Sequence, residues 1–308
     1  MKCIKPDFRQ SSEYEMHDPA CGTGGFLIGA FEWIMKQTNH GSKLTIKDRE
    51  RLVKKTFSGM DIVQNTRRLA LMNCYLHELE AQIHFGDALG EGIHVNKRYD
   101  VILTNPPFGS RGAGGAPSRD DFLFSTSNKQ LNFVQHSMTV LKLGGKAGIV
   151  VPDGVLGGTS GKDLRENLLK NCDVHTILRL PEGTFTPYAA VKANVVFFTK
   201  GTPTKEVWVY NLRTTVRNIN KSNPLTEKLF EDFEKCYDQK PRLETDRFKK
   251  FSISHIVKGN YNLDVGLNST YSVDEDVIEP EILIKEIDVN LQTAVKSLNE
   301  LTTRLKRD

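Results

Sequence analysis

The sequence contains no run of about 20 consecutive apolar residues, which excludes a transmembrane helix of ordinary length. Its first residues, 1–7, lack the apolar segment of a secretory signal peptide. The five cysteines form neither C-x-x-C pairs nor a zinc-ligand spacing, so we expect no metal site. An odd number of cysteines favours reduced thiols, and together these absences predict a cytoplasmic protein without a membrane partner.

The sequence also lacks a large excess of charge of either sign. The chain has 42 Lys and Arg against 38 Asp and Glu residues, a net charge of only +4. This balance permits DNA binding without requiring it, and it indicates that sequence recognition belongs to a partner. With 308 residues, 38% of them hydrophobic and 26% charged, the chain can form one large globular domain and an appendage.

A proline pair follows the apolar run 99–104, which predicts a buried strand that ends in a rigid loop, Asn105-Pro106-Pro107-Phe108. The Asn105 side-chain oxygen and the Pro106 carbonyl are acceptors that could pull an exocyclic amine, such as adenine N6, towards tetrahedral geometry. The prolines fix the backbone φ, and Phe108 offers a ring on which a flipped base could stack. This chemistry requires no metal. A rigid turn that only closes the strand is the structural alternative.

A glycine-rich loop, DPACGTGGF at residues 18–26, connects an extended stretch (12–17) to an expected helix (26–35). Glycines between a strand and a helix let a ligand approach the backbone closely, but this loop is neither G-x-G-x-x-G nor a P-loop. Asp18 at its start would repel a pyrophosphate and suits a cationic ligand. A molecule with an amino-acid end, a sulfonium and an adenosine fits that description.

Together, the two loops resemble motifs I and IV of S-adenosylmethionine (AdoMet)-dependent amino-methyltransferases. More narrowly, they resemble those of the methylation (M) subunit of type I restriction-modification systems, an N6-adenine DNA methyltransferase. The expected helix 65–77 carries wording close to that of this family, and the resemblance covers residues 17–200. It implies an α/β fold with a doubly wound, mostly parallel sheet, with AdoMet as cofactor.

The resemblance also assigns two carboxylates that follow expected strands. It implies that Asp61, at the end of the strand 57–62, takes the ribose hydroxyls of AdoMet, and that Asp87 takes the adenine amino group. Both roles suit a carboxylate, which accepts hydrogen bonds. The implied cofactor contacts are Asp18, Ala20, Cys21, Gly22, Thr23, Gly24, Gly25, Asp61, Ile62, Asp87, Ala88 and Asn105.

Two features depart from the family pattern. The family places a helical domain and a further cofactor-contacting motif upstream of the glycine-rich loop, whereas 17 residues precede Asp18, which predicts an N-terminally truncated chain. Gly22 also lies 39 residues before Asp61, against about 20 in dinucleotide-binding folds. The extra residues, 36–55, include TIKDRE at 45–50, which predicts an additional helix start.

Strands and helices alternate in the middle of the chain, which predicts a parallel sheet with the site at the carboxyl ends of its strands. The segment 194–199 follows a strand without an intervening helix, so we expect it to be antiparallel. Gly144 and Gly145 are expected to close the first of two helices. The expected helices are 132–141 and 162–170, and the expected strands are 146–152, 174–180, 194–199 and 207–210.

The glycine-rich segment 109–117 predicts a mobile flap, and Arg111 within it and Arg119 just after it could then meet DNA phosphates, with a solvated surface loop as the alternative. The loop before the antiparallel strand contains Phe185. By resemblance, its ring could pack on the flipped base, and the alternative is a place in the core. Phe108 and Phe185 are therefore the predicted base-stacking residues.

Beyond residue 210 the sequence is mainly polar, which predicts irregular structure and short helices. The end of the chain has apolar residues at alternating spacings of three and four, which predicts a coiled-coil-like helix. Such a narrow seam favours a partner, by resemblance the specificity (S) subunit, over the chain's own sheet. The seam residues are Ile284, Ile287, Leu291, Ala294, Leu298, Leu301 and Leu305.

The sequence thus predicts a methyltransferase domain (1–210), a mixed connecting region (211–273) and a C-terminal helix (274–308). The predicted partners are double-stranded DNA, an S subunit and a second M subunit, with or without a restriction (R) subunit. Two alternatives stay open: methylation of another amino group, in RNA guanine or protein glutamine, and an inactive truncated assembly module. The sequence disfavours a cytosine-C5 enzyme, because that chemistry needs a nucleophilic cysteine and no Pro-Cys dipeptide occurs.

Overall fold

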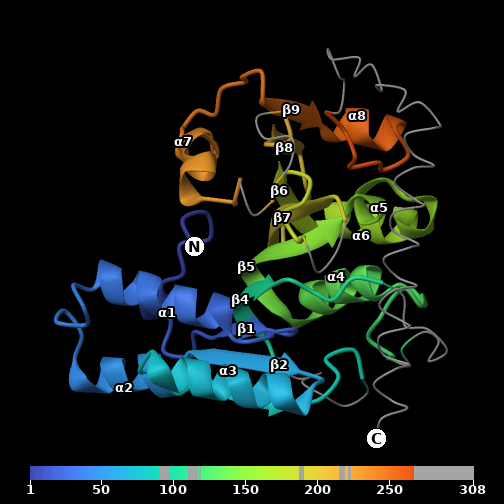
Figure 1. Ribbon diagram of the computed structural model, residues 1–308. Coiled ribbons are helices and arrows are strands. Elements are labelled where there is room, and N and C mark those ends of the chain that lie inside the picture. The colour runs from blue at the N-terminus through green and yellow to red at the C-terminus, as the bar shows by residue number, and fades with distance from the viewer. Residues whose placement is uncertain are drawn as a thin grey trace, which may run out of the picture. The chain divides into compact units, whose positions relative to one another are not determined.

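A nine-stranded β-sheet lies at the centre of the described part of the chain in the computed structural model (Figure 1). The strand order is β3-β2-β1-β4-β5-β7-β6-β8-β9. The structure describes residues 1–90, 97–109, 117, 119–186, 191–214, 219–220 and 223–266. The strands are β1 Met16–Asp18, β2 Phe57–Asp61, β3 Gln82–Phe85, β4 Tyr99–Thr104, β5 Leu141–Pro152, β6 Cys172–Arg179, β7 Ala193–Lys200, β8 Glu206–Asn211 and β9 Phe248–Ser252.

Most neighbouring strands of the sheet are parallel. Strands β1 to β5 pair in parallel, whereas β7 pairs antiparallel with both β5 and β6. β7 is therefore the antiparallel strand that the segment 194–199 predicted. Because β1, β2 and β4 are neighbours that run parallel, the loops that follow them leave the sheet at the same end, that of the strand carboxyl termini. The expected candidate residues stand on these loops.

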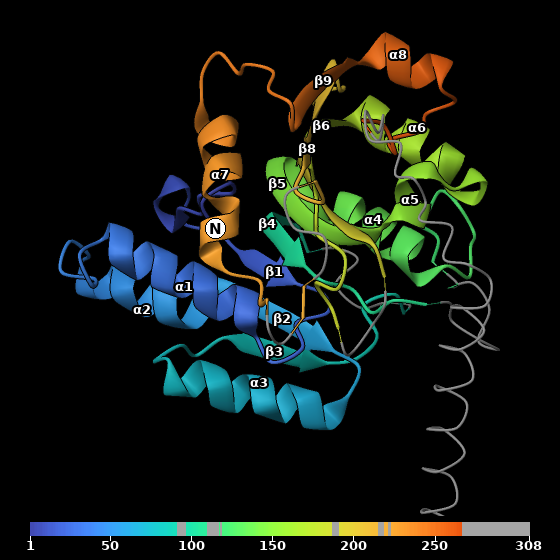
Figure 2. The ribbon, with the colours of Figure 1, turned by 45° about the horizontal axis from the view of Figure 1, so that its top comes forward.

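Helices cover both faces of the sheet (Figures 1 and 2). Helices α1, α2, α3 and α7 contribute to one buried cluster, and α4, α5, α6 and α8 contribute to the other. Ile102 and Leu103 belong to different clusters because successive strand residues point to opposite faces. The expected doubly wound α/β fold is confirmed. The helices are α1 Gly25–Gln37, α2 Ile46–Lys55, α3 Gln64–Leu76, α4 Lys129–Val140, α5 Asp153–Gly157, α6 Lys162–Asn171, α7 Glu231–Asp238 and α8 Ile253–Lys258.

The long connection between α1 and β2 contains the additional helix that residues 45–50 predicted. The Thr45 hydroxyl accepts a hydrogen bond from the Asp48 N–H at 3.1 Å and donates one to the Asp48 carboxylate at 2.7 Å. This N-cap satisfies a backbone donor that the first turn of α2 would otherwise leave free. The inserted helix accounts for the long spacing between Gly22 and Asp61.

The junction between α4 and β5 differs from the prediction. The sequence predicts a helix that closes at Gly144 and Gly145, but α4 ends at Val140 and β5 begins at once. Gly144 has a φ of 78° within β5, and the register of β5 against β4 shifts just after Tyr99. The two glycines therefore serve an irregularity of the strand and not a helix cap.

The described residues after β8 contain α7, β9 and α8. The short helices match the expectation for this region, whereas β9, which pairs antiparallel with β8, is not among the expected strands. The domain boundaries at 210 and 273 stay predictions. The seam residues of the expected C-terminal helix lie outside the described residues, as does most of the segment 109–117.

The described residues contain no helix with the length and apolar character needed to cross a membrane. In the same residues, no group of three or more His, Cys, Asp or Glu side chains could hold a metal ion. All five cysteines are free thiols. Burial raises the pKa of both Cys3 and Cys172 to about 12, so these two thiols are uncharged near neutral pH.

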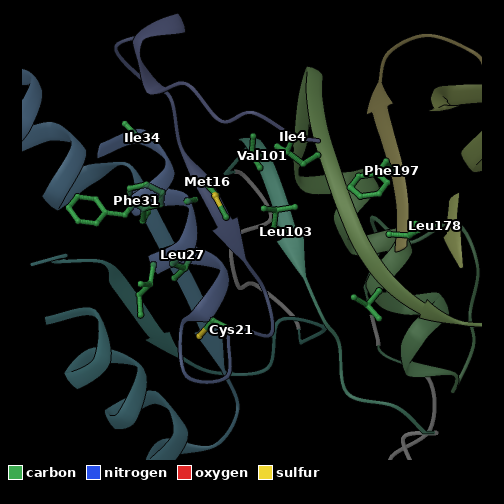
Figure 3. Packing of buried hydrophobic residues seen from close by; sticks show 14 of the residues in the cluster. Ile4, Met16, Cys21, Leu27, Phe31, Ile34, Val101, Leu103, Leu178 and Phe197 are labelled. Atoms are coloured by element: carbon green, nitrogen blue, oxygen red, sulfur yellow. The ribbon is translucent and has the colours of Figure 1, made fainter. Parts of the chain in front are cut away.

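Strand β2 carries a glycine where the loop after β1 packs against it. A Cβ atom at Gly59 would lie 2.9 Å from the Cβ of Cys21 and 3.1 Å from the Cδ1 of Leu27. Both side chains belong to the buried cluster in Figure 3. A larger residue at position 59 would therefore push the glycine-rich loop and the start of α1 away from the sheet.

We predict that Gly59→Ala lowers the free energy of unfolding by about 1–3 kcal/mol, because the added methyl overpacks this contact. The matched control is Gly154→Ala, since a Cβ at Gly154 in α5 meets nothing within 4 Å. There we expect a neutral effect or a gain of about 0.5–1 kcal/mol. Urea unfolding measures both, and equal stability of the two variants would contradict the prediction.

Candidate cofactor and target-base site

The glycine-rich loop between β1 and α1 depends on two glycines. Gly22 and Gly24 have φ values of 55° and 84°, in the left-handed region that favours glycine. A Cβ at Gly24 would lie 3.2 Å from the Sγ of Cys74 on α3. The Cys21 N–H donates a hydrogen bond to the Met60 carbonyl at 2.9 Å. The loop is thus held between the end of β2 and α3.

One side of this loop is open. A Cβ at Gly22 or at Gly25 would meet nothing within 4 Å, so a ligand can approach the backbone there. The Nδ2 of Asn73 on α3 donates a hydrogen bond to the Thr23 carbonyl at 3.0 Å and fixes the tip of the loop. The open backbone is therefore presented in one conformation.

Asp61 links the loops that follow β1 and β2. Its Oδ2 accepts a hydrogen bond from the Gly22 N–H at 3.2 Å, and its Oδ1 accepts one from the Val63 N–H at 2.8 Å. Each carboxylate oxygen can accept a further hydrogen bond, so both can still bind hydroxyl groups. The side chains of Ile62 and Val63 are 62% and 51% exposed, which places apolar surface beside the carboxylate.

Asp87 follows β3, as predicted, at the strand end next to Asp61. β3 pairs with β2, and the Gly86 N–H donates a hydrogen bond to the Asp61 carbonyl at 3.1 Å. The Asp87 Oδ1 accepts a hydrogen bond from the Leu89 N–H at 2.9 Å. This bond closes a turn in which Ala88 is buried. The two expected acidic positions therefore stand on adjacent loops.

The Asn-Pro-Pro-Phe loop leaves β4, the other neighbour of β1. Asn105 is exposed and Pro106 is buried. The Nε2 of Gln130 on α4 donates a hydrogen bond to the Pro107 carbonyl at 3.0 Å. Among the described residues, neither the Asn105 side chain nor the Pro106 carbonyl takes part in a hydrogen bond. Both expected acceptors therefore keep their hydrogen-bonding capacity, and the Asn105 side chain is also exposed.

Phe108 and Phe185 come together from distant parts of the chain. Their ring centroids lie 5.4 Å apart and their planes meet at 67°. Both rings are partly buried at the border of the same apolar cluster. The structure thus brings together the two aromatic rings that the sequence predicts to stack on a base.

Asp18 lies beneath the glycine-rich loop and is 1% exposed. Its Oδ1 accepts a hydrogen bond from the Ala20 N–H at 3.0 Å. Burial raises the pKa of the Asp18 carboxyl to about 7, the charge of Asp61 adds to this rise, and Thr104 and the Ala20 N–H oppose it. Near neutral pH, this carboxyl is therefore divided between its charged and uncharged forms.

The expected phosphate contact of Arg119 is wrong. Its side chain is 1% exposed and forms two hydrogen bonds with the Asp121 carboxylate, at 2.8 and 2.6 Å. A guanidinium paired inside the protein cannot reach DNA unless these bonds break. Arg111 lies outside the described residues.

Two residues that position the site, Gln130 and Asn73, are assigned no role by the sequence. Each uses a side-chain amide on a helix to hold a loop carbonyl that is distant along the chain.

The N-terminus of α4 differs from the prediction. The sequence predicts that this helix starts at residue 132, but α4 begins at Lys129. The Asn128 side chain accepts a hydrogen bond from the Leu131 N–H at 3.1 Å, and this N-cap is the signal that could have placed the start.

Comparisons with known proteins agree with this geometry. The family model N-6 DNA Methylase matches residues 3–276. The methylase subunits of the type I restriction enzymes StySPI, from Salmonella potsdam, and EcoKI, from Escherichia coli K12, are 38% and 37% identical to this chain. Both alignments cover 98% of this chain and 65% of the relative, so the chain spans just under two thirds of their length.

A solved structure of the EcoKI M protein has a TM-score of 0.78 and 34% identity, over 99% of this chain and 71% of that chain. The strand order and this similarity define the fold as that of AdoMet-dependent methyltransferases. The chain belongs to the N-6 DNA methylase family. The family and the fold class that the sequence predicts are therefore confirmed.

The raised pKa of Asp18 predicts a pH-dependent stability. The folded state holds the Asp18 proton up to about pH 7, whereas an unfolded Asp releases it near pH 4. Stability from this group is therefore fully present below about pH 4 and falls as pH rises to 7, by at most about 1.4 kcal/mol per pH unit. Asp18→Asn should remove this dependence and be the more stable protein at pH 8. Urea unfolding at pH 5.5 and 8 tests this, and an equal pH response of both proteins would refute it.

Proposed function

We propose that this chain is the catalytic part of an enzyme that transfers a methyl group from AdoMet to N6 of adenine in double-stranded DNA. The observation that carries the proposal is the presence of two complementary half-sites at one end of the sheet. The open glycine-rich loop follows β1, Asp61 and Asp87 follow β2 and β3 on one side of it, and the Asn105–Phe108 loop follows β4 on the other side. Relatives named as methylase subunits of type I restriction enzymes favour this function over methylation of RNA guanine or protein glutamine.

The residues at the first half-site fit AdoMet. Asp61 retains acceptor capacity for two ribose hydroxyls, and Asp87 on the adjacent loop would accept the adenine amino group. Ile62 and Ala88 would flank the adenine. When bound, AdoMet supplies a methyl group on a positively charged sulfur. The ionised form of Asp18, beneath the loop, would favour that charge.

The glycine-rich loop would contribute mainly through its backbone. The side chains of Asp18 and Cys21 are buried, so neither is presented directly to a ligand. We expect Ala20, Cys21 and Thr23 to contact AdoMet through main-chain groups, together with the open backbone of Gly22–Gly25. Glycine permits this approach because it has no Cβ.

The second half-site would act on the target amine. Asn105 and the Pro106 carbonyl would accept its two N–H groups, so that the lone pair leaves conjugation with the ring. Transfer would break the bond between the AdoMet sulfur and its methyl group, form the N–C bond and release one proton from the amine to solvent, so no residue would have to act as a general base. Phe108 and Phe185 would hold the base after it leaves the duplex. Position and hydrogen bonding thus supply the catalysis.

The partners belong to the same proposal. The relatives are named as subunits, which supports assembly with an S subunit and a second M subunit, with or without an R subunit. A further solved structure described as part of the assembly of a type I restriction-modification system has a TM-score of 0.74 and 28% identity to this chain. Because its substrate is DNA, we expect the enzyme to work in the cytoplasm.

We predict that two variants separate the half-sites. Asp61→Ala should lose AdoMet binding, because it removes an acceptor and releases the Gly22 N–H. Asn105→Ala should keep AdoMet affinity and lower methyl transfer to DNA by at least about a hundredfold. Calorimetric titration measures the first quantity, and transfer of labelled methyl groups by the assembled complex measures the second.

Asp246→Ala, which removes an exposed carboxylate before the edge strand β9, is the control for both assays. Methyl transfer at the wild-type rate by Asn105→Ala would refute the proposed mechanism. Absence of AdoMet binding by the wild-type chain would instead favour the inactive assembly module.

We predict that Phe108→Ala weakens the affinity for DNA with an unpaired target adenine by about 1–3 kcal/mol, because a stacking surface is lost. Phe108→Tyr keeps the ring and should restore most of the affinity. Fluorescence titration with DNA that carries a mismatch at the target base measures the difference. Equal affinities of the alanine and tyrosine variants would show that the ring does not stack on the base.

A further inference from the structure

Helix α4 is buried on every side although much of its sequence is polar. Its polar residues Gln130, Asn132, Gln135 and His136 are each at most 4% exposed. Buried amide and imidazole groups require hydrogen-bond partners, since an unpaired group costs free energy. The partners of this helix therefore show which part of the molecule it organises.

The amides of α4 hold the segment that follows the Asn-Pro-Pro-Phe loop. Asn132 donates to the Thr126 carbonyl at 2.7 Å. Gln135 accepts from the Phe124 N–H at 3.0 Å and donates to the Phe124 carbonyl at 2.9 Å. Residues 119–128 have almost no regular structure of their own, and α4 supplies partners for their backbone groups.

Arg119 extends this network to the turn at Asp87–Ala88, which is expected to contact the cofactor. Its Nη1 donates to the Ala88 carbonyl at 2.9 Å and lies 2.8 Å from the Nδ1 of His136. Its Nε and Nη2 bind the Asp121 carboxylate, and its guanidinium lies 4.2 Å from the ring centroid of Phe122. One buried guanidinium thus contacts the turn after β3, helix α4 and the start of the segment 119–128.

We propose that Arg119 is a positioning residue that couples two parts of the molecule. One is the turn at Asp87–Ala88, which is proposed to bind AdoMet, and the other is the segment 119–128, which follows the Asn105–Phe108 loop in the chain. The inference rests on the proposed function, because Ala88 belongs to the pocket proposed for AdoMet. A shift of the Ala88 carbonyl moves one partner of the guanidinium, and the rigid fork passes that shift to Asp121. Cofactor binding and the order of the segment 119–128 therefore depend on each other.

A purely structural role would not distinguish Arg119 from another buried arginine that binds backbone carbonyls. Arg165 on α6 is 3% exposed and donates to the carbonyls of Tyr261 and Val155 at 2.7 and 3.0 Å. These contacts lie away from the loops of both half-sites. Arg165→Lys is therefore a matched control for the loss of a buried guanidinium fork.

The test measures hydrogen exchange of the full chain with and without AdoMet, together with AdoMet affinity by calorimetry. In the wild type and in Arg165→Lys, we expect AdoMet to slow exchange in the segment 119–128. In Arg119→Lys, which keeps the charge but loses the fork, we expect affinity to fall about fivefold or more and the slowing to disappear at saturating AdoMet.

Asp121→Asn provides a second variant in case Arg119→Lys does not fold. It weakens the link to the segment and keeps the Ala88 contact, so the slowing in 119–128 should be lost and AdoMet affinity should fall less than in Arg119→Lys. Exchange that AdoMet slows equally in the wild type and both variants would overturn the coupling alone. A wild-type chain that does not bind AdoMet would overturn the proposed function and the coupling with it.

Discussion

The Asp61 carboxylate is the contact on which the arrangement of the site depends. It accepts hydrogen bonds from Gly22 and Val63, so the loops after β1 and β2 are fixed relative to each other. The Asp61 carbonyl also accepts the Gly86 N–H, which adds the turn after β3 to the same unit. One residue at the end of β2 therefore sets the spacing of all three loops proposed to bind AdoMet. Asp61 thus positions the loops in addition to its proposed contact with AdoMet.

On the other side of β1, helix α4 supplies hydrogen-bond partners to a segment without regular structure. A segment without regular structure leaves its backbone donors and acceptors unpaired, and burial of such groups is costly. The amides of Gln130, Asn132 and Gln135 pair with these groups at Pro107, Thr126 and Phe124. Backbone groups of the segments 105–108 and 119–128 thereby find partners without the geometry of a strand.

Local patterns in the sequence predict much of the sheet. The apolar run of β4 and the Thr45–Asp48 cap of α2 were readable because the determining residues are neighbours in the chain. Gln130 on α4 looks like a residue of a solvent-facing loop, and only the tertiary fold buries it. The partners of Arg119 at Ala88 and His136 are 31 and 17 positions away, so no local signal reveals its burial.

In the site, too, some features could be predicted from the sequence and others depend on the tertiary fold. The family resemblance led to Asp61 and Asp87, and the chemistry of its own residues led to the Asn105–Phe108 loop. The structure places all of them after strands β2, β3 and β4. The contact between Phe108 and Phe185 could not be derived from spacing, because it depends on how the loop before β7 folds back. The strand β9, with the sequence FKKFS, reads as polar loop and forms only because β8 offers an unpaired edge.

The edge strand β9 affects how the sheet can pair with strands of other chains. Within the described residues, β9 is the last strand of the sheet, and its Lys249 and Lys250 are exposed. Charged side chains on an edge strand disfavour the addition of a strand from another chain. The opposite edge strand, β3, has only four residues, too few for an extended ladder. Within the described residues, both borders of the sheet thus resist edge-to-edge aggregation.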